Sequence, residues 1–520
     1  MRSTTRRLLA ASVALAMITA ACSSSDDYSN ETLTTLARTQ ALVGPTEGFN
    51  SIGGTDTVND QPYDLVFFDN SGVNPRIDTI DDALSTFAID VDTGSYTIGR
   101  RWLADGNLPD KDSVRVEEYV NFFDYRYPVP GDGEAFAIDL EGGPTPFTEN
   151  DRYQLLRIGI QSRVVADEDR KPANLTFVID VSGSMDREDR LELVKDALTL
   201  LVGQLRPSDQ VGLVVYGSRG EVVLDPTSVE EEDEILRAIE SLHPEGSTNA
   251  AEGLVLGYRL AREAYTEGAI NRVILASDGV ANVGNTGSDS ILKEIEDAAG
   301  NGIQLVTVGF GMGNYNDVLM EQLADNGDGI YAYVDNIGEA ERLFVHDLTG
   351  TLETVAADTK VQVAFHEDAV EVWRLVGFEN RAIDDDDFRD DTVDAGEIGA
   401  GHSVTALYEV RLAEGVEAGD KLATVSLRWR DPNSGSTMEL AKSITSDAMA
   451  GSYFDTSGSF QLAATVATYA EVLRQSIWAE HVDWSELVAE SHSLLGERIG
   501  DDPDVAEFVD LVERAARLDA

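Results

Sequence analysis

A short loop in the middle of the chain offers oxygen ligands at alternate positions. It reads Asp180-Val181-Ser182-Gly183-Ser184, so one carboxylate and two hydroxyls stand two residues apart. The apolar run 175–179 before it predicts a buried strand, and apolar residues at helical spacing follow it. Loops at the carboxyl ends of strands bind ligands in open α/β sheets. Hydroxyl and carboxylate oxygens suit a hard cation such as Mg²⁺.

Two further loops carry matching oxygen donors. Gly246-Ser247-Thr248-Asn249 precedes a helical stretch over 250–265, and Asp278-Gly279 follows the apolar strand 272–276. Both lie at junctions of an alternating β/α pattern, as the first loop does. The alternative is purely structural, with a serine-rich turn, a threonine N-cap and an Asp-Gly turn. That alternative needs three independent coincidences, so the sequence favours a shared cation site.

Together the three loops resemble the metal-ion-dependent adhesion site of the von Willebrand factor type A domain. That site joins an Asp-x-Ser-x-Ser loop to a threonine and an aspartate from two later loops, and all occur here in order. The resemblance implies a site for Mg²⁺, or for Mn²⁺ or Ca²⁺, in which one or both aspartates act through water. It also implies an open position for an acidic side chain of a protein partner. The implied ligands are Asp180, Ser182, Ser184, Thr248 and Asp278.

Residues 171–350 are expected to form the domain that positions these loops. Strands alternate there with helical segments, which predicts an α/β fold with a doubly wound, mostly parallel sheet. This is the von Willebrand factor A or Rossmann-like arrangement. The short segment 221–225 follows a tight turn and is expected to be an antiparallel edge. The predicted strands lie near 175–181, 211–216, 221–225, 272–277, 303–309 and 330–334.

Strand patterns also lie on both sides of the α/β segment. They cover 134–168 and 355–448, so the α/β domain is expected to be inserted in, or flanked by, a β-sandwich. A helical region is predicted over 449–520. Three segments resemble domains of a group of bacterial envelope lipoproteins that carry a type A domain. Two of them, 87–96 and 114–128, lie in an N-terminal domain expected over 63–133, and the third is 460–477.

The N-terminus is typical of an exported protein. Arg2, Arg6 and Arg7 precede an apolar core over 8–18 that is too short to span a bilayer as a helix. Thr19-Ala20-Ala21-Cys22 then resembles a bacterial lipobox, although Thr19 replaces the usual leucine. An ordinary signal peptide cleaved near this point is the alternative.

The lipobox resemblance sets the expected location. It implies that residues 1–21 are a lipoprotein signal peptide and that Cys22 carries the lipid, and the polar composition of 22–62 predicts a flexible linker. The protein is then extracytoplasmic and lipid-anchored to a membrane of the cell envelope. Cys22 is the only cysteine, so its acylation leaves none for a disulfide.

Acidic residues dominate the charge. The 520 residues include 95 acidic and 39 basic side chains, for a formal net charge of −56. Such a surface repels nucleic acid, so no nucleic-acid partner is expected. The membrane link is expected to come from the lipid anchor alone.

Four other patterns suggest chemistry, and a structural interpretation is favoured for each. Asp92-Thr93-Gly94-Ser95 copies the aspartic protease signature, but the second Asp-Thr-Gly that such an enzyme needs is missing. Gly309-Phe310-Gly311-Met312-Gly313 lacks phosphate-loop spacing. His243, the histidine nearest the metal loops, would be a general base only if it faced the cation. The acidic run over 384–397 is either a loose Ca²⁺ site or, the favoured alternative, a solvated loop.

The function expected from these observations is binding rather than catalysis. The protein is predicted to be a lipid-anchored, extracytoplasmic binding protein that engages an acidic partner through the cation, and not an enzyme. An envelope assembly or scaffold factor with an incidental metal site is the first alternative. A metal-dependent hydrolase is the second, and it would need His243 as its base.

Overall fold

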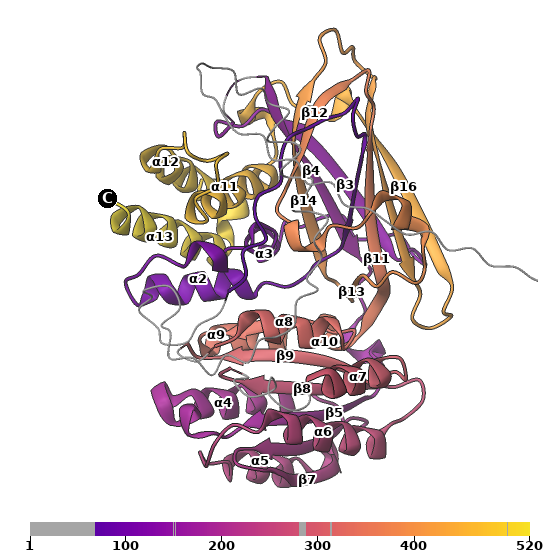
Figure 1. Ribbon diagram of the computed structural model, residues 1–520, viewed down its shortest axis with the longest axis vertical. Helices are drawn as coiled ribbons and strands as arrows, with labels where there is room; N and C mark the ends of the chain where they lie inside the picture. The colour runs from indigo at the N-terminus through magenta and orange to yellow at the C-terminus, as the bar shows by residue number, and fades with distance from the viewer. Residues whose placement is uncertain (1–67, 149, 151, 280–287, 313–314, 497) are drawn as a thin grey trace, which may run out of the picture. The chain divides into compact units, whose positions relative to one another are not determined.

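The computed structural model describes residues 68–520, except 149, 151, 280–287, 313–314 and 497 (Figure 1). The expected signal peptide, Cys22 and the whole of the expected linker over 22–62 lie outside the described residues. Among the helices that are described, none combines the length and apolar character that crossing a membrane requires.

A six-stranded sheet forms the centre of the α/β domain. Five strands are parallel, and β7 lies antiparallel to β6 at one edge, as the sequence predicted for 221–225. The order across the sheet is β10 (Tyr331–Val334), β9 (Gln304–Phe310), β8 (Ile270–Ser277), β5 (Ala173–Asp180), β6 (Gln210–Tyr216) and β7 (Gly220–Ser228).

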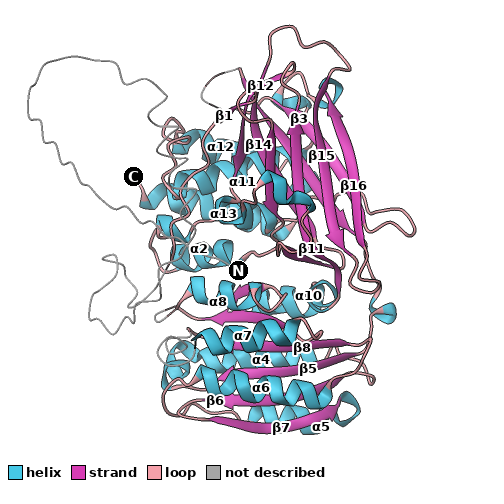
Figure 2. Cartoon of the chain, turned by 45° about the vertical axis from the view of Figure 1, so that its right-hand side comes forward, coloured by secondary structure: helices cyan, strands magenta, loops and turns pink. Residues whose placement is uncertain are grey.

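Helices cover both faces of this sheet (Figure 2). The alternation of side chains along β5 explains this, because Phe177 and Ile179 join one apolar core while Val178 joins the other. The predicted doubly wound fold is therefore confirmed. One face packs against α4 (Arg190–Val202), α5 (Glu232–Glu240), α9 (Ile337–Glu341) and α10 (Leu348–Leu352). The other packs against α6 (Ala250–Ala264), α7 (Ser288–Ala299) and α8 (Asp317–Asp325).

Strands from before and after the α/β domain form a two-sheet β-sandwich. β4 pairs antiparallel with β14 through nine residue pairs from Ser403–Gln161 to Arg411–Tyr153, which confirms the expected pairing across the insertion. One sheet has the order β1 (Ile77–Asp78), β12 (Val370–Val376), β14 (Ser403–Leu412), β4 (Tyr153–Ser162) and β3 (Phe136–Gly143). The other has β13 (Gly396–Gly399), β11 (Thr354–Phe365), β15 (Lys421–Arg430) and β16 (Thr437–Thr445), with β2 (Leu84–Ala88) also paired to β11.

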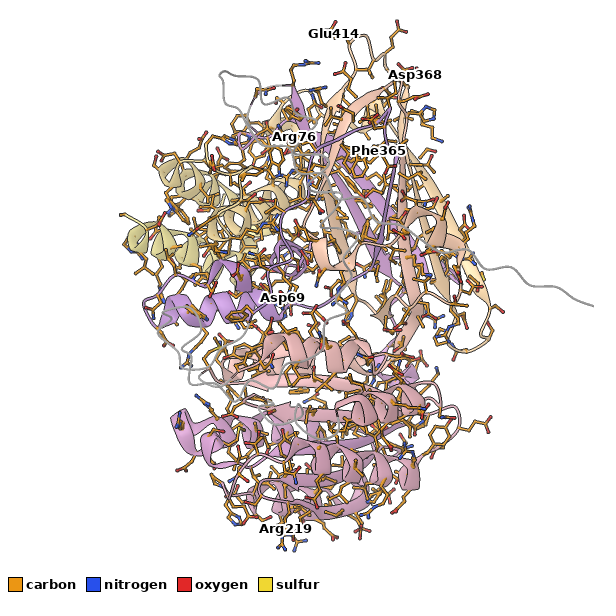
Figure 3. All side chains as sticks on the ribbon, viewed as in Figure 1. Asp69, Arg76, Arg219, Phe365, Asp368 and Glu414 are labelled. Carbon is orange, nitrogen blue, oxygen red and sulfur yellow. The ribbon has the colours of Figure 1, made fainter. Side chains whose placement is uncertain are left out.

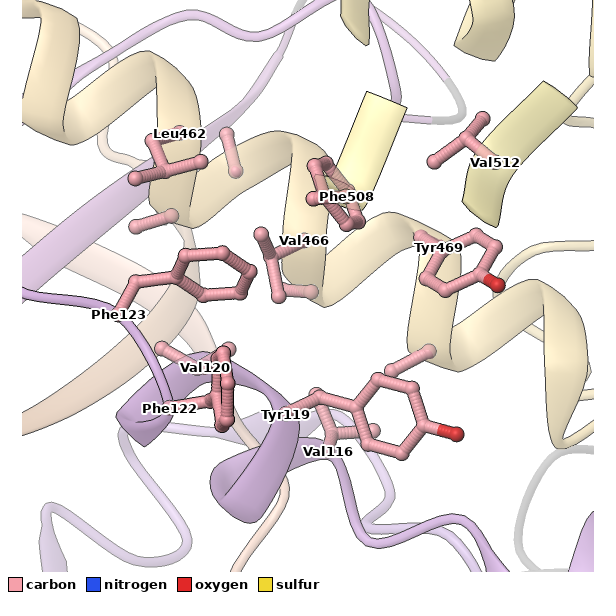
Figure 4. Packing of buried hydrophobic residues seen from close by; sticks show 14 of the residues in the cluster. Val116, Tyr119, Val120, Phe122, Phe123, Leu462, Val466, Tyr469, Phe508 and Val512 are labelled. Atoms are coloured by element: carbon pink, nitrogen blue, oxygen red, sulfur yellow. The ribbon is translucent and has the colours of Figure 1, made fainter. Parts of the chain in front are cut away.

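The C-terminal region is helical, as predicted, and packs on a helix from the N-terminal part of the chain. Tyr119, from α3 (Val116–Asn121), and Phe123 contact the aromatic rings of Tyr469 and Phe508 (Figure 4). These belong to α11 (Gly458–Leu473) and α13 (Pro503–Leu518), and α12 (Trp484–Leu494) completes the group.

The described part of 63–133 is divided among three cores. Its strands β1 and β2 join the sandwich, and α3 joins the C-terminal helices. Helix α2 (Gly94–Ala104) lies between two cores: Ile98 and Trp102 are fully buried in the α/β domain, whereas Tyr96 and Leu103 pack with the C-terminal helices. The apolar side chains of this segment therefore pack both on one another, as Tyr96 does on Phe122, and on sequence-distant elements.

Candidate metal site

The predicted metal-site residues lie on three loops at one edge of the α/β sheet. Asp180 ends β5, and Asp278 directly follows β8, the strand beside it. A 3-10 helix, Gly183–Asp189, holds Ser184. The Gly183 amide donates to the Gly246 carbonyl at 3.2 Å, which joins this loop to the one that carries Thr248. Adjacent parallel strands end at the same edge, so residues far apart in sequence meet there.

Hydroxyl and carboxylate groups from these loops are joined by hydrogen bonds. The Oγ atoms of Ser182 and Ser184 lie 3.0 Å apart, and Ser184 donates to Asp278 Oδ1 at 3.0 Å. The Ser182 amide donates to Asp180 Oδ1 at 2.8 Å, and Ser277 Oγ donates to Oδ2 of the same carboxylate at 3.0 Å. The donor set contains oxygen alone, which fits a hard divalent cation.

Both carboxylates are removed from water. Asp180 is 0% and Asp278 1% exposed. Burial raises the pKa of Asp180 to about 6, against hydrogen bonds from Ser182, and the nearby Asp278 raises it further. Burial also raises the pKa of Asp278, while Ser184 and Arg190 counteract this. One paired arginine beside two buried acids leaves a negative charge, and such an environment favours a bound cation.

Arg190 belongs to the site and was not identified from the sequence. Its Nη1 lies 2.7 Å from Asp278 Oδ2, and its Nη2 donates to the Met312 carbonyl. Gly311 makes room for it, because a Cβ there would clash with the arginine side chain. The available signal was helical spacing, since Arg190 lies on the same buried face of α4 as Val194 and Ala197.

The Arg190 contact gives a prediction about metal-dependent stability. Arg190→Gln weakens a charged hydrogen bond to a buried carboxylate, so the free energy of unfolding in EDTA should fall by about 1–3 kcal/mol. Mg²⁺ should restore more stability to the variant than to the wild type, because the cation replaces the lost positive charge. Thermal melts with and without Mg²⁺ measure both effects. An equal Mg²⁺ response in the two proteins would contradict the assigned role of Arg190.

Three of the remaining sequence patterns take structural positions. Asp92 Oδ1 accepts from the Tyr331 amide at 3.0 Å, and Gly94 lies against the Tyr331 ring, so Asp92-Thr93-Gly94 anchors α2 to β10. Gly311 adopts a φ of +77° beside Arg190, as a structural glycine turn requires. The His243 side chain is 76% exposed, with Glu245 4.0 Å away.

Three family patterns match the sequence. The von Willebrand factor type A domain matches residues 174–346, and a second von Willebrand factor pattern matches 65–157. The C-terminal pattern of the uncharacterized protein YfbK matches 350–518. These matches fall on the α/β domain and on the segments that precede and follow it.

Similar proteins extend the likeness beyond the α/β domain. The chain is 35% identical over 473 residues to the uncharacterized protein YfbK of Escherichia coli strain K12, covering 85% of this chain and 80% of YfbK. It is 29% identical over 210 residues to human inter-alpha-trypsin inhibitor heavy chain H3, covering 38% of this chain and 23% of that protein. A solved von Willebrand factor type A protein from Catenulispora acidiphila matches with a TM-score of 0.42 and 16% identity, over 67% of this chain and 82% of that one.

Proposed function

Because the chain belongs to the same family as YfbK of Escherichia coli and carries a von Willebrand factor type A domain, we propose that it is a binding protein. It captures a protein partner through a divalent cation, Mg²⁺ or alternatively Mn²⁺ or Ca²⁺, and works outside the cytoplasm on a lipid anchor. The observation that carries the proposal is the hydrogen-bonded set of serine hydroxyls and buried carboxylates at the edge of the sheet.

The charges of the proposed ligands leave the cation reactive toward a carboxylate. Ser182, Ser184 and Thr248 are neutral, and Asp180 and Asp278 are the only anions in the set. Arg190 already offsets part of the Asp278 charge at 2.7 Å. A bound divalent cation would supply a positive centre that accepts an aspartate or glutamate side chain of the partner.

An exposed arginine beside the site favours an acidic partner. Arg219 lies in the β6–β7 turn, and Figure 3 shows it at the edge of the α/β domain. This turn is bonded to both neighbours of Thr248, because Ser247 donates to Ser218 and Asn249 donates to the Gly217 carbonyl. The Arg219 side chain is 75% exposed, with only a 3.8 Å contact to Glu221. It offers local positive charge on a protein that is otherwise strongly acidic.

The position of His243 favours binding over hydrolysis. A hydrolase would need a base directed at the cation, and the solvent-facing His243 offers poor support for that role. Absence of turnover on model esters and peptides in the presence of Mg²⁺ is therefore expected. Metal-dependent turnover that His243→Ala removes would favour the hydrolase alternative.

Partner binding is expected to require the cation. Partners would first be identified by crosslinking in intact cells, and each would then be tested for binding to the purified protein. EDTA should eliminate binding and Mg²⁺ should restore it, because the cation contributes the central contact. Arg219→Ala should weaken binding while Mg²⁺ affinity stays unchanged, since this side chain lies outside the ligand set.

Monovalent salt separates this mode of binding from simple charge attraction. It should change the affinity little, because it screens the long-range repulsion between two acidic surfaces as well as the local attraction. Binding that survives EDTA would favour the scaffold alternative, in which the metal site is incidental. Binding that survives EDTA and collapses in salt would indicate a basic partner on the acidic surface.

The lipid anchor gives a prediction of its own. Cys22→Ser should release the protein from the membrane fraction or leave its signal peptide uncleaved, because the thiol is the acylated group. Cell fractionation and N-terminal mass spectrometry measure the two outcomes, with Ser25→Ala as the control that stays anchored. A Cys22→Ser protein that remains membrane-bound with a normally cleaved N-terminus would exclude acylation at this position.

A further inference from the structure

Three carboxylates meet where the α/β domain approaches the β-sandwich. Asp328 comes from the turn between α8 and β10, whereas Asp394 and Glu397 come from the segment that forms β13. Oxygen atoms of the three side chains all lie within 4.8 Å of one another. Residues more than sixty positions apart in sequence are thus held together despite their like charge.

Glu397 lacks the partners that a buried carboxylate normally has. It is 8% exposed, and its Oε1 has no hydrogen-bond donor among the described residues. A buried, unpaired carboxylate oxygen costs considerable free energy unless something else satisfies it. Burial raises the pKa of Glu397 well above its ordinary value, and Asp328 and Asp394 raise it further.

The nearby arginine side chains do not pair with Glu397. Arg430 pairs at 2.5 Å with Asp358, a fourth acid that lies beside Asp394. The buried Arg272 donates to the Leu352 carbonyl and to Thr354, and its charge is felt at Glu397. Within the described part of the chain, no ion pair of 4.0 Å or less joins either arginine to Glu397. Four acids therefore face one directly paired arginine.

A second acidic cluster shows the difference. Asp90, Glu118 and Glu321 also bring their oxygens within 4.8 Å of one another. There, however, Arg115 pairs with Glu118, and Arg381 pairs with Asp90 at 3.1 Å and with Glu321 at 2.9 Å. Each carboxylate of that cluster therefore has an arginine partner, which Glu397 lacks.

We propose that Asp328, Asp394 and Glu397 form a calcium site that ties the α/β domain to the β-sandwich. This site is separate from the one proposed at Asp180 and does not depend on it. The ion would take an oxygen from each of the three carboxylates, including the Glu397 oxygen that has no donor. One ligand belongs to the α/β domain and two to the sandwich, so binding would strengthen the junction between them.

The geometry favours Ca²⁺ over Mg²⁺. Oxygens that share one Ca²⁺ at about 2.3–2.6 Å lie at most about 5 Å apart, which the three carboxylates satisfy. Ca²⁺ also tolerates irregular sets of six to eight oxygens, whereas Mg²⁺ requires near-octahedral geometry. A cavity of about 460 Å³, lined in part by Asp394 and Glu397, gives the ion access and leaves room for water as further ligands.

Calcium titration of the full chain in an Asp180→Ala background tests this site alone. Isothermal calorimetry should detect a single Ca²⁺ site per chain, and adding Glu397→Gln or Asp394→Asn should weaken its affinity at least about tenfold. Asp394 is exposed, so its variant keeps the test valid if Glu397→Gln fails to fold. Asp386→Asn is the matched control, because it removes one exposed acid from the same run without touching the cluster.

The melting temperature provides the second measurement. In EDTA, Glu397→Gln should melt at or above the temperature of its parent, because it removes an unpaired buried charge, and Ca²⁺ should no longer raise it. Calcium affinity unchanged by both Glu397→Gln and Asp394→Asn would overturn the proposal, as would the absence of any Ca²⁺ site in the Asp180→Ala background. These outcomes do not depend on the site proposed at Asp180. If the native chain did not bind Mg²⁺ there, the expected Ca²⁺ affinities and melting temperatures would be the same.

Discussion

Replacing Arg381 by methionine is expected to destabilise the protein by about 3–5 kcal/mol, because it leaves buried carboxylates without their shared cation. Arg381 follows β12 of the sandwich, and its side chain is 12% exposed. It lies 3.1 Å from Asp90, 2.9 Å from Glu321 and 3.0 Å from Asp325. The last two acids belong to α8, so this one arginine joins the sandwich to the α/β domain.

The loss should depend on pH in a defined direction. Burial already raises the pKa values of Glu321 and Asp325, and removing Arg381 raises them further. An acid whose pKa is raised in the folded state contributes stability below its unfolded pKa and loses it as the pH rises through the folded pKa. The defect should therefore be large at pH 7 and shrink as the pH falls toward the ordinary carboxylate range.

Urea denaturation at pH 7 and pH 5 measures this prediction. Arg389→Met is the matched control, because Arg389 is 66% exposed in a surface pair with Glu439. The urea concentration at which this variant unfolds should hardly change. If Arg381→Met unfolds at the wild-type urea concentration, or if its defect grows as the pH falls, the arginine does not neutralise these acids.

Replacing Asp180 by alanine is expected to lower Mg²⁺ affinity by at least about 100-fold. The carboxylate is fully buried and supplies one of the two negative charges in the proposed ligand set. After the substitution, Asp278 is the only carboxylate left in the set, and Arg190 already pairs with it. Partner binding should be lost together with the metal.

Calorimetry with Mg²⁺ measures the effect, and circular dichroism checks that the variant is folded. Asp186→Asn is the control, because Asp186 is an exposed acid in the 3-10 helix that follows the serine loop. It removes a similar charge at a similar place, so its Mg²⁺ affinity should stay within about threefold of wild type. Unchanged Mg²⁺ affinity in Asp180→Ala would exclude this carboxylate as a ligand.

The sequence predicted those residues of the site that a local pattern identifies. An apolar strand followed by oxygen donors marks a ligand loop, so Asp180, Ser182 and Ser184 could be proposed from spacing and residue type. The paired β patterns on both sides of residues 171–350 similarly predicted a sandwich, and the β4–β14 pairing confirms it. Residue type and periodicity are enough to predict a strand, a helix or a ligand loop when the pattern lies within that segment of the sequence.

The unpredicted contacts join residues that share no local pattern. Arg190 meets Asp278 across 88 positions in the sequence, and an arginine at the start of a helix normally indicates solvent. Trp102 fills the α/β core from α2, a helix that lies in the sequence between β2 and β3 of the sandwich. Asp328 meets Glu397 only because the turn after α8 lies against the segment that forms β13. Such pairings depend on tertiary packing, which one sequence without a template does not specify.

The most direct test of the proposed metal site is a crystal structure of the protein soaked with Mn²⁺ and measured at the manganese absorption edge. Mn²⁺ accepts the same oxygen ligands as Mg²⁺ and gives an anomalous signal. The expected result is an anomalous peak in contact with Ser182 Oγ and Ser184 Oγ, with Asp180, Thr248 and Asp278 around it. Saturating Mn²⁺ with no peak at these residues, and with the serine–aspartate hydrogen bonds unchanged, would contradict the site.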